Sequence, residues 1–164
     1  MSAEAREDGT PWINEMLGRV DELIDEYRRS LYDCLDGLTE DEARARLVPS
    51  KTTLLGLLKH VTFVEGVWFD QAISGRTHAE VGISNTVESS FSLSSSDTIA
   101  TVQAAHRERC LASNRALSEL QPQTVVDGRG PRPVWAVRLQ VLRELAQHAG
   151  HADILREQVI ARRS

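Results

Sequence analysis

Four stretches of the chain repeat apolar side chains at every third or fourth position, and this repeat restricts the possible folds strongly. Residues at that spacing lie on one side of an α-helix, so each stretch predicts a helix with one buried side. We expect these helices over residues 11–37, 51–74, 97–120 and 134–161. Little of the remaining sequence is typical of strands. The fold class that follows is all-α: a four-helix bundle with a long crossover between the second and third helices.

The ends of these stretches carry helix start signals. Pro11 suits a first turn, because the backbone N–H at that position has no helical partner. Thr39 and Glu42 have the spacing of a capping box, which predicts a short additional turn, and we expect Ser50 to cap the second long helix. The crossover, residues 75–96, is longer than the roughly 12 to 15 residues of an ordinary loop. We therefore expect it to have a functional role.

Size and charge limit the class of protein. A chain of 164 residues can bury its own core, so we treat 1–164 as a single domain and the polar segment 1–10 as a flexible N-terminal tail. The net charge of −5, without clustered lysine and arginine, argues against nucleic acid as a partner. No stretch approaches the roughly 18 apolar residues of a membrane span, and no signal-peptide pattern is present. We expect a cytoplasmic protein that does not associate with membranes.

The last predicted helix carries the clearest signal for a functional site. In the segment RELAQHAGHADILRE, His148 follows Glu144 by four residues and His151 follows His148 by three. Side chains at these intervals share one helix face. Helical bundles commonly build metal centres from inward Glu and His side chains, and these donors suit Zn²⁺, Ni²⁺ or Fe²⁺. Gly150 costs the helix roughly 1 kcal/mol relative to alanine, so we expect another segment to pack closely there.

A further ligand should come from a facing helix, and His60 is the candidate. It lies among apolar residues in LLGLLKHVTFVEGVWF, where a neutral imidazole needs a partner for its ring nitrogens. A metal or an ordinary core hydrogen bond would meet that need, and both stay open. Glu144 and His148 also fit a simple exposed pair on a helix surface. Glu65, five residues beyond His60, points elsewhere, and we interpret it as a solvated carboxylate or as a group behind the ligands.

The remaining reactive side chains are interpreted as having no part in the site. Two cysteines are too few and too isolated for a thiolate cluster, and we expect Cys34 and Cys110 to be buried and inert. His106 stands beside the charged Arg107 and Glu108, and we expect it to face solvent.

The order of these motifs resembles the DinB/YfiT-like superfamily of metal-dependent four-helix bundles. The likeness is carried by LLKHVTFVEGVWF, the long crossover and the HAGHADILRE string, covers roughly residues 12–162, and is closest to the actinobacterial branch of mycothiol-dependent S-transferases and isomerases. It implies three metal ligands, His60, Glu144 and His148. Many relatives have histidine where Glu144 stands, whereas the mycothiol-using branch is similar to this chain in having glutamate. The resemblance leaves the role of His151 open between ligand, group behind the ligands and substrate contact.

The function that the resemblance implies is a metal-dependent thiol transferase. A divalent transition metal, Zn²⁺ or Ni²⁺, would hold a small-molecule thiol such as mycothiol as its thiolate for attack on a small electrophile. His151 is the candidate catalytic residue, as a proton donor or acceptor. Two other classes stay open: a non-catalytic metal-binding or stress-response bundle acting as a dimer, and a metal-dependent hydrolase. We expect a homodimer.

Overall fold

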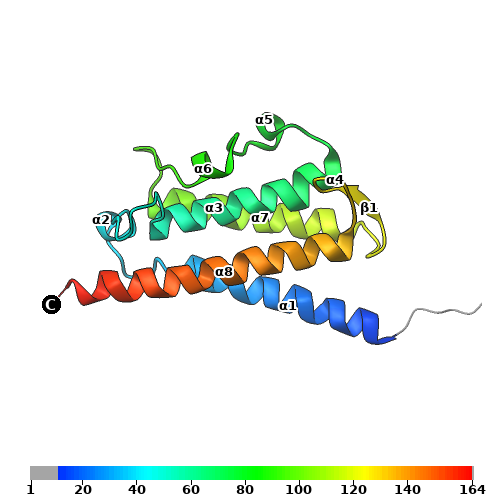
Figure 1. Cartoon of the computed structure of the whole chain (residues 1–164), viewed down its shortest axis with the longest axis horizontal. Coiled ribbons are helices and arrows are strands. Elements are labelled where there is room, and N and C mark those ends of the chain that lie inside the picture. Colours follow the sequence, from blue (N-terminus) through cyan, green and yellow to red (C-terminus); the bar gives the residue numbers. More distant parts are fainter. Residues whose placement is uncertain (1–10, 164) are drawn as a thin grey trace, which may run out of the picture.

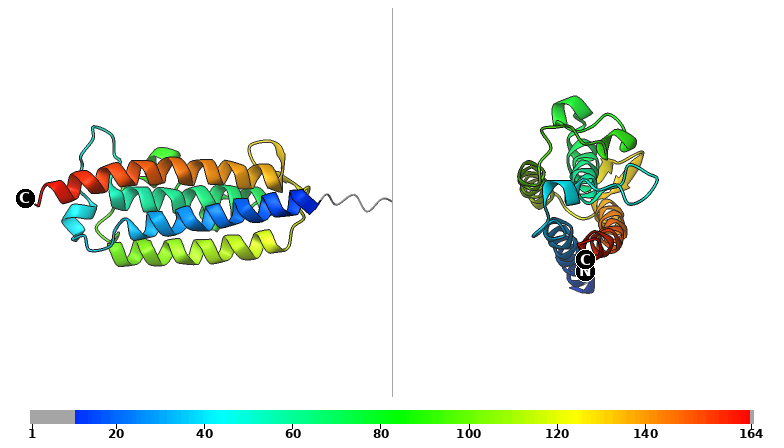
Figure 2. Two further views of the ribbon diagram at one scale, coloured as in Figure 1. Left: turned by 90° about the horizontal axis from the view of Figure 1, so that it is seen from below. Right: turned by 90° about the vertical axis from the view of Figure 1, so that its left-hand side faces the viewer.

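The computed structural model describes residues 11–163, and most of them are helical (Figure 1). Four long helical segments lie side by side along the molecule (Figure 2): α1 (Pro11–Asp33), α3 (Leu54–Gly66), α7 (Ile99–Ser118) and α8 (Val134–Ala161). The all-α prediction is therefore confirmed in its coarse form. The assignment of residues 1–164 to a single domain stays a prediction, and the tail assigned to residues 1–10 lies outside the described residues.

Short elements fill the connections between the long helices. The chain continues from α3 into a π-helical turn, η1 (Val67–Gln71), and then α4 (Ala72–Ser74). The other short helices are α2 (Glu40–Ala43), α5 (His78–Val81) and α6 (Val87–Ser90). Strands β1 (Val125–Asp127) and β2 (Pro131–Pro133) form an antiparallel hairpin before α8. The glycines and prolines of this segment predict only a connection, so the hairpin was missed.

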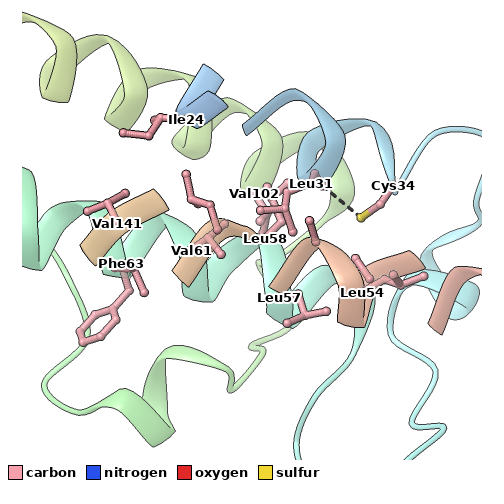
Figure 3. Close-up of a cluster of buried hydrophobic side chains, with 14 of the residues drawn as sticks. Ile24, Leu31, Cys34, Leu54, Leu57, Leu58, Val61, Phe63, Val102 and Val141 are labelled. Atoms are coloured by element: carbon pink, nitrogen blue, oxygen red, sulfur yellow. Dashed lines mark hydrogen bonds between the residues drawn. The ribbon is translucent and has the colours of Figure 1, made fainter. Parts of the chain in front are cut away.

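Helix α3 is the central element of the packing. It packs on both α7 and α8, while α1 packs along α8. Figure 3 shows the apolar side chains that meet between them, among them Ile24, Leu31, Leu58, Val61 and Val141. Burial of each such side chain contributes roughly 1.5 to 3 kcal/mol relative to exposure. Within residues 11–163, no helix combines the length and apolar character that crossing a bilayer requires.

The starts of two helices differ from the prediction by a few residues. Helix α3 is capped by Thr53, whose Oγ1 accepts a hydrogen bond from the backbone N–H of Gly56 at 3.0 Å. The expected cap, Ser50, lies outside the helix, and its hydroxyl donates to Thr52 instead. Thr98 caps α7. The predicted capping box of Thr39 and its partner glutamate is confirmed at the start of α2.

The crossover lies along the outer side of α3 (Figure 1). Lys59 on α3 donates from Nζ to the side chain of Asp97 and to the backbone carbonyl of Ser92, both at 2.8 Å. Gly66 allows close contact farther along, because a Cβ at this position would lie 2.6 Å from Cγ2 of Ile83. The crossover is thus a packed layer that covers the side of α3 that the other long helices leave open.

Candidate metal centre

The structure brings His60, Glu144 and His148 together. One possible ligand atom from each side chain lies within 4.8 Å of those of the other two. His60 comes from the middle of α3, and the other two come from one face of α8. The rings of His60 and His148 meet edge to face with centroids 4.6 Å apart, and Nε2 of His148 lies 3.7 Å from Oε2 of Glu144. The direct packing of α3 on α8 is what allows these mid-helix positions to meet.

Both imidazoles of this cluster are buried. His60 is 3% exposed and His148 is 9% exposed. Burial, together with a smaller contribution from the nearby His148, lowers the pKa of His60 to about 3. Burial also lowers the pKa of His148, although the charge of Glu144 opposes that shift. The two rings are therefore neutral at physiological pH, which is the form of histidine that binds metal ions.

The hydrogen bonds around the cluster leave one oxygen of Glu144 and one ring nitrogen of His148 without a hydrogen-bond donor or acceptor among the described side chains. Oε1 of Glu144 accepts hydrogen bonds from Gln140 at 2.9 Å and from Arg143 at 2.7 Å, so Oε2 is the oxygen turned toward His148. Nδ1 of His148 is buried and has no hydrogen-bond partner among the described residues. An unpaired buried nitrogen is unusual in a folded protein. Two imidazoles and one carboxylate with such a nitrogen fit a divalent transition metal ion.

His151 lies on the same helix beside this cluster but outside it. Its side chain is exposed, and its ring centroid is 5.6 Å from that of His148. It is not one of the three residues whose ligand atoms meet. The expected close packing at Gly150 was wrong, because a Cβ there would have no atom within 4 Å apart from its own helix backbone and chain neighbours. The role of His151 in proton transfer stays a prediction.

Glu65 is not solvated, contrary to one of the two interpretations. Its side chain is fully buried, and its carboxylate accepts two hydrogen bonds from Arg28 of α1, from Nε at 2.7 Å and from Nη2 at 2.8 Å. Burial alone would lower the pKa of Arg28, but the hydrogen bonds and charge of Glu65 outweigh it, and the pKa is raised. Arg28 therefore stays charged, and it forms a buried ion pair with the Glu65 carboxylate between α1 and α3.

His106 is also buried, so the expectation that it faces solvent was wrong. Its Nδ1 lies 3.2 Å from Oγ1 of Thr62, and its Nε2 lies 3.5 Å from Sγ of Cys110. Cys34 is buried as expected, whereas Cys110 is only half-buried. Burial, reinforced by the adjacent Glu65 carboxylate, raises the pKa of Cys110 to about 12. Its thiol is therefore protonated at neutral pH and a poor nucleophile.

Sequence reasoning missed two residues that contact His60. Oγ of Ser90 lies 2.7 Å from Nδ1 of His60, and the ring of Phe91 stacks on the imidazole with centroids 3.9 Å apart and planes 13° apart. Both belong to the crossover. They stand in a stretch rich in serine, and no local pattern there distinguishes one serine from the next.

Comparison with known protein families shows which family the chain belongs to. The mycothiol S-transferase family matches residues 19–161, a range that contains His60, Glu144 and His148. The chain belongs to this family. A search of curated proteins found no match. Membership in the mycothiol S-transferase family confirms the resemblance to the DinB/YfiT-like proteins, and it supports a thiol-transferase type of function.

Proposed function

We propose that this protein is a metal-dependent transferase that joins a low-molecular-weight thiol of the mycothiol type to a small electrophilic substrate. The observation that carries the proposal is the cluster of two buried imidazoles, His60 and His148, with the partly buried Glu144 carboxylate, in a member of the mycothiol S-transferase family. In this proposal the four long helices form a DinB/YfiT-like four-helix bundle around the site. The reaction takes place in the cytoplasm, where small thiols are kept reduced.

The three clustered side chains would hold a divalent transition metal ion, Zn²⁺ or Ni²⁺. Such an ion, when bound, supplies positive charge that lowers the pKa of a coordinated thiol and favours the reactive thiolate. Gln140 and Arg143 hold one oxygen of Glu144, which fixes the direction of the other oxygen. The burial of both imidazoles keeps them neutral and keeps competing water away from their nitrogens.

The transfer itself exchanges one bond to carbon for another. The thiol gives up its proton, its sulfur forms a bond to the electrophilic carbon, and the leaving group departs with the electron pair of the bond that breaks. We assign the proton transfer to His151, whose imidazole is exposed next to the ligand cluster. General acid–base groups of this kind typically contribute a factor of 10² to 10⁴ in rate.

Metal analysis of protein purified without a polyhistidine tag tests the ligand set. We expect one divalent ion per chain in the wild type and a loss of that ion in His60→Ala and in His148→Ala. His78→Ala is the matched control, because it removes a histidine of the crossover that is not part of the cluster. Stoichiometric metal that persists in both ligand variants would exclude the proposed site.

Turnover of a bimane electrophile, with and without mycothiol, tests the reaction. We expect acceleration that needs both mycothiol and the metal, and a rate about 10²-fold lower in His151→Gln with metal content unchanged. Glu157→Gln, an exposed change on the same helix, should leave the rate unaltered. An absence of metal-dependent acceleration would favour the non-catalytic binding class instead. The expected homodimer is a separate prediction, which sedimentation analysis measures.

A further inference from the structure

Ser90 is the polar partner of His60 in the crossover. It is the last residue of α6 in the crossover, and its side chain is fully buried. Its Oγ lies 2.7 Å from Nδ1 of His60 and 2.5 Å from the backbone carbonyl oxygen of Val87. One hydroxyl group therefore contacts two neighbours at short range.

The two contacts of this hydroxyl determine where the protons lie. The carbonyl oxygen of Val87 can only accept, so the single proton of Ser90 is donated to it. Oγ of Ser90 must then accept the hydrogen bond from His60, and Nδ1 of His60 must carry the proton of the neutral ring. Its Nε2 is left with a free lone pair, which is what a metal ligand needs.

We propose that Ser90 is a positioning residue that holds His60 in the tautomer with the proton on Nδ1, and thereby presents Nε2 as the metal-binding atom. In this proposal the crossover contributes to the metal centre by orienting one of its ligands. The proposal rests on the proposed function in one respect only, since it takes His60 to be a ligand.

Contacts of the neighbouring residue Phe91 help to fix the His60 ring next to the Ser90 hydroxyl. Phe91, the next residue, stacks on the face of the imidazole at 3.9 Å between centroids. Its backbone approaches α3 closely at Gly56, where a Cβ would lie 3.0 Å from the carbonyl oxygen of Phe91. Glycine at this position therefore lets the segment settle against the turn of α3 that precedes His60. The ring is fixed both at Nδ1 and on one face.

The test compares wild-type protein with Ser90→Ala, and with Ser92→Ala as the matched control. Ser92 lies two residues farther along the crossover. Its backbone carbonyl, which accepts a hydrogen bond from Nζ of Lys59, is kept in the alanine variant. The tautomer of His60 in metal-free protein is read from two-bond ¹H–¹⁵N correlation spectra of the imidazole. The affinity for Zn²⁺ is measured by competition with a chromophoric chelator. Loss of a hydrogen-bond partner behind a ligand typically lowers metal affinity 10- to 100-fold.

We expect the Nδ1–H tautomer in the wild type and in Ser92→Ala. In Ser90→Ala we expect the Nε2–H form to appear and the affinity for Zn²⁺ to fall roughly 10- to 100-fold. An Nε2–H tautomer in the metal-free wild type would overturn the proposal. This measurement uses the wild-type protein alone, so it does not depend on whether a variant folds. A Ser90→Ala protein whose tautomer is unchanged would also overturn the proposal, whatever its affinity. Failure of the wild type to bind any metal would instead sink the proposed function, and the spectra would still decide the role of Ser90.

Discussion

Replacing Glu65 by glutamine should destabilise the protein markedly, because it breaks a fully buried ion pair. The carboxylate accepts hydrogen bonds of 2.7 and 2.8 Å from Arg28, whose side chain is only 6% exposed. Breaking one partner of a buried pair typically costs about 3 to 5 kcal/mol, because the remaining charge is left without compensation. The amide oxygen of glutamine still accepts one hydrogen bond, and Asp25 still contacts Arg28. We therefore expect a loss of about 3 kcal/mol, at the lower end of that range.

Urea and thermal unfolding of metal-free protein measure this loss. For a chain of this size, about 3 kcal/mol corresponds to a fall of roughly 6 to 12 °C in Tm. Glu22→Gln is the matched control: it breaks the Arg19–Glu22 pair at 2.9 Å, but those side chains are 62% and 67% exposed. Exposed pairs contribute about 0 to 1 kcal/mol, so the control should unfold near the wild-type midpoint.

A double variant separates the loss of charge compensation from a simple loss of packing. If an unpaired Arg28 is the cause, adding Arg28→Met to Glu65→Gln should restore part of the stability, because no buried charge is then left over. A loss below about 1 kcal/mol in Glu65→Gln, or no coupling between the two changes, would refute the reasoning.

The space around three helical glycines and the burial of His60 predict further changes in the free energy of unfolding. Gly150→Ala and Gly18→Ala should each raise the free energy of unfolding by about 0.5 to 1 kcal/mol, because a helical Cβ has room at both positions. Gly66→Ala should lower it by about 1 to 3 kcal/mol through the clash with Ile83; equal effects in the same urea titrations would contradict this contrast. The metal-free wild type should lose stability as pH falls from about 6.5 toward 3, because the unfolded chain protonates His60 near its ordinary pKa of 6.5 and the folded chain only near 3. His60→Gln should show a smaller loss over this range in urea midpoints measured against pH, and parallel curves would show that His60 is not the group responsible.

The long helices and the shared face of Glu144 and His148 could be predicted because their signals are local. Helix α8 begins at Val134 and ends at Ala161, as its apolar repeat predicts. The spacing of Glu144 and His148 requires a shared face, whatever the rest of the chain does. His60 needed the resemblance to a family, since an imidazole in an apolar helix fits a core hydrogen bond equally well.

The contacts that were missed depend on partners far away in the sequence. Spacing along α3 showed that Glu65 points away from His60. No local pattern shows that Arg28 of α1 lies on that side and pairs with it. His106 was assigned to the surface because charged residues flank it, yet adjacent helical residues point in different directions. Ser90 depends on how the crossover folds back over α3, which no periodicity encodes.

The meeting of residues from α3, α6 and α8 at one point also links the site to the folding of the whole chain. Closing such long loops costs conformational entropy, so the cluster exists only once the helices and the crossover have docked. A ligand that binds only the docked chain stabilises it by RT ln(1 + [L]/Kd), about 2.7 kcal/mol at a concentration of 100 Kd. With the proposed metal as that ligand, metal supply in a cell would affect the lifetime of this protein as well as the proposed reaction.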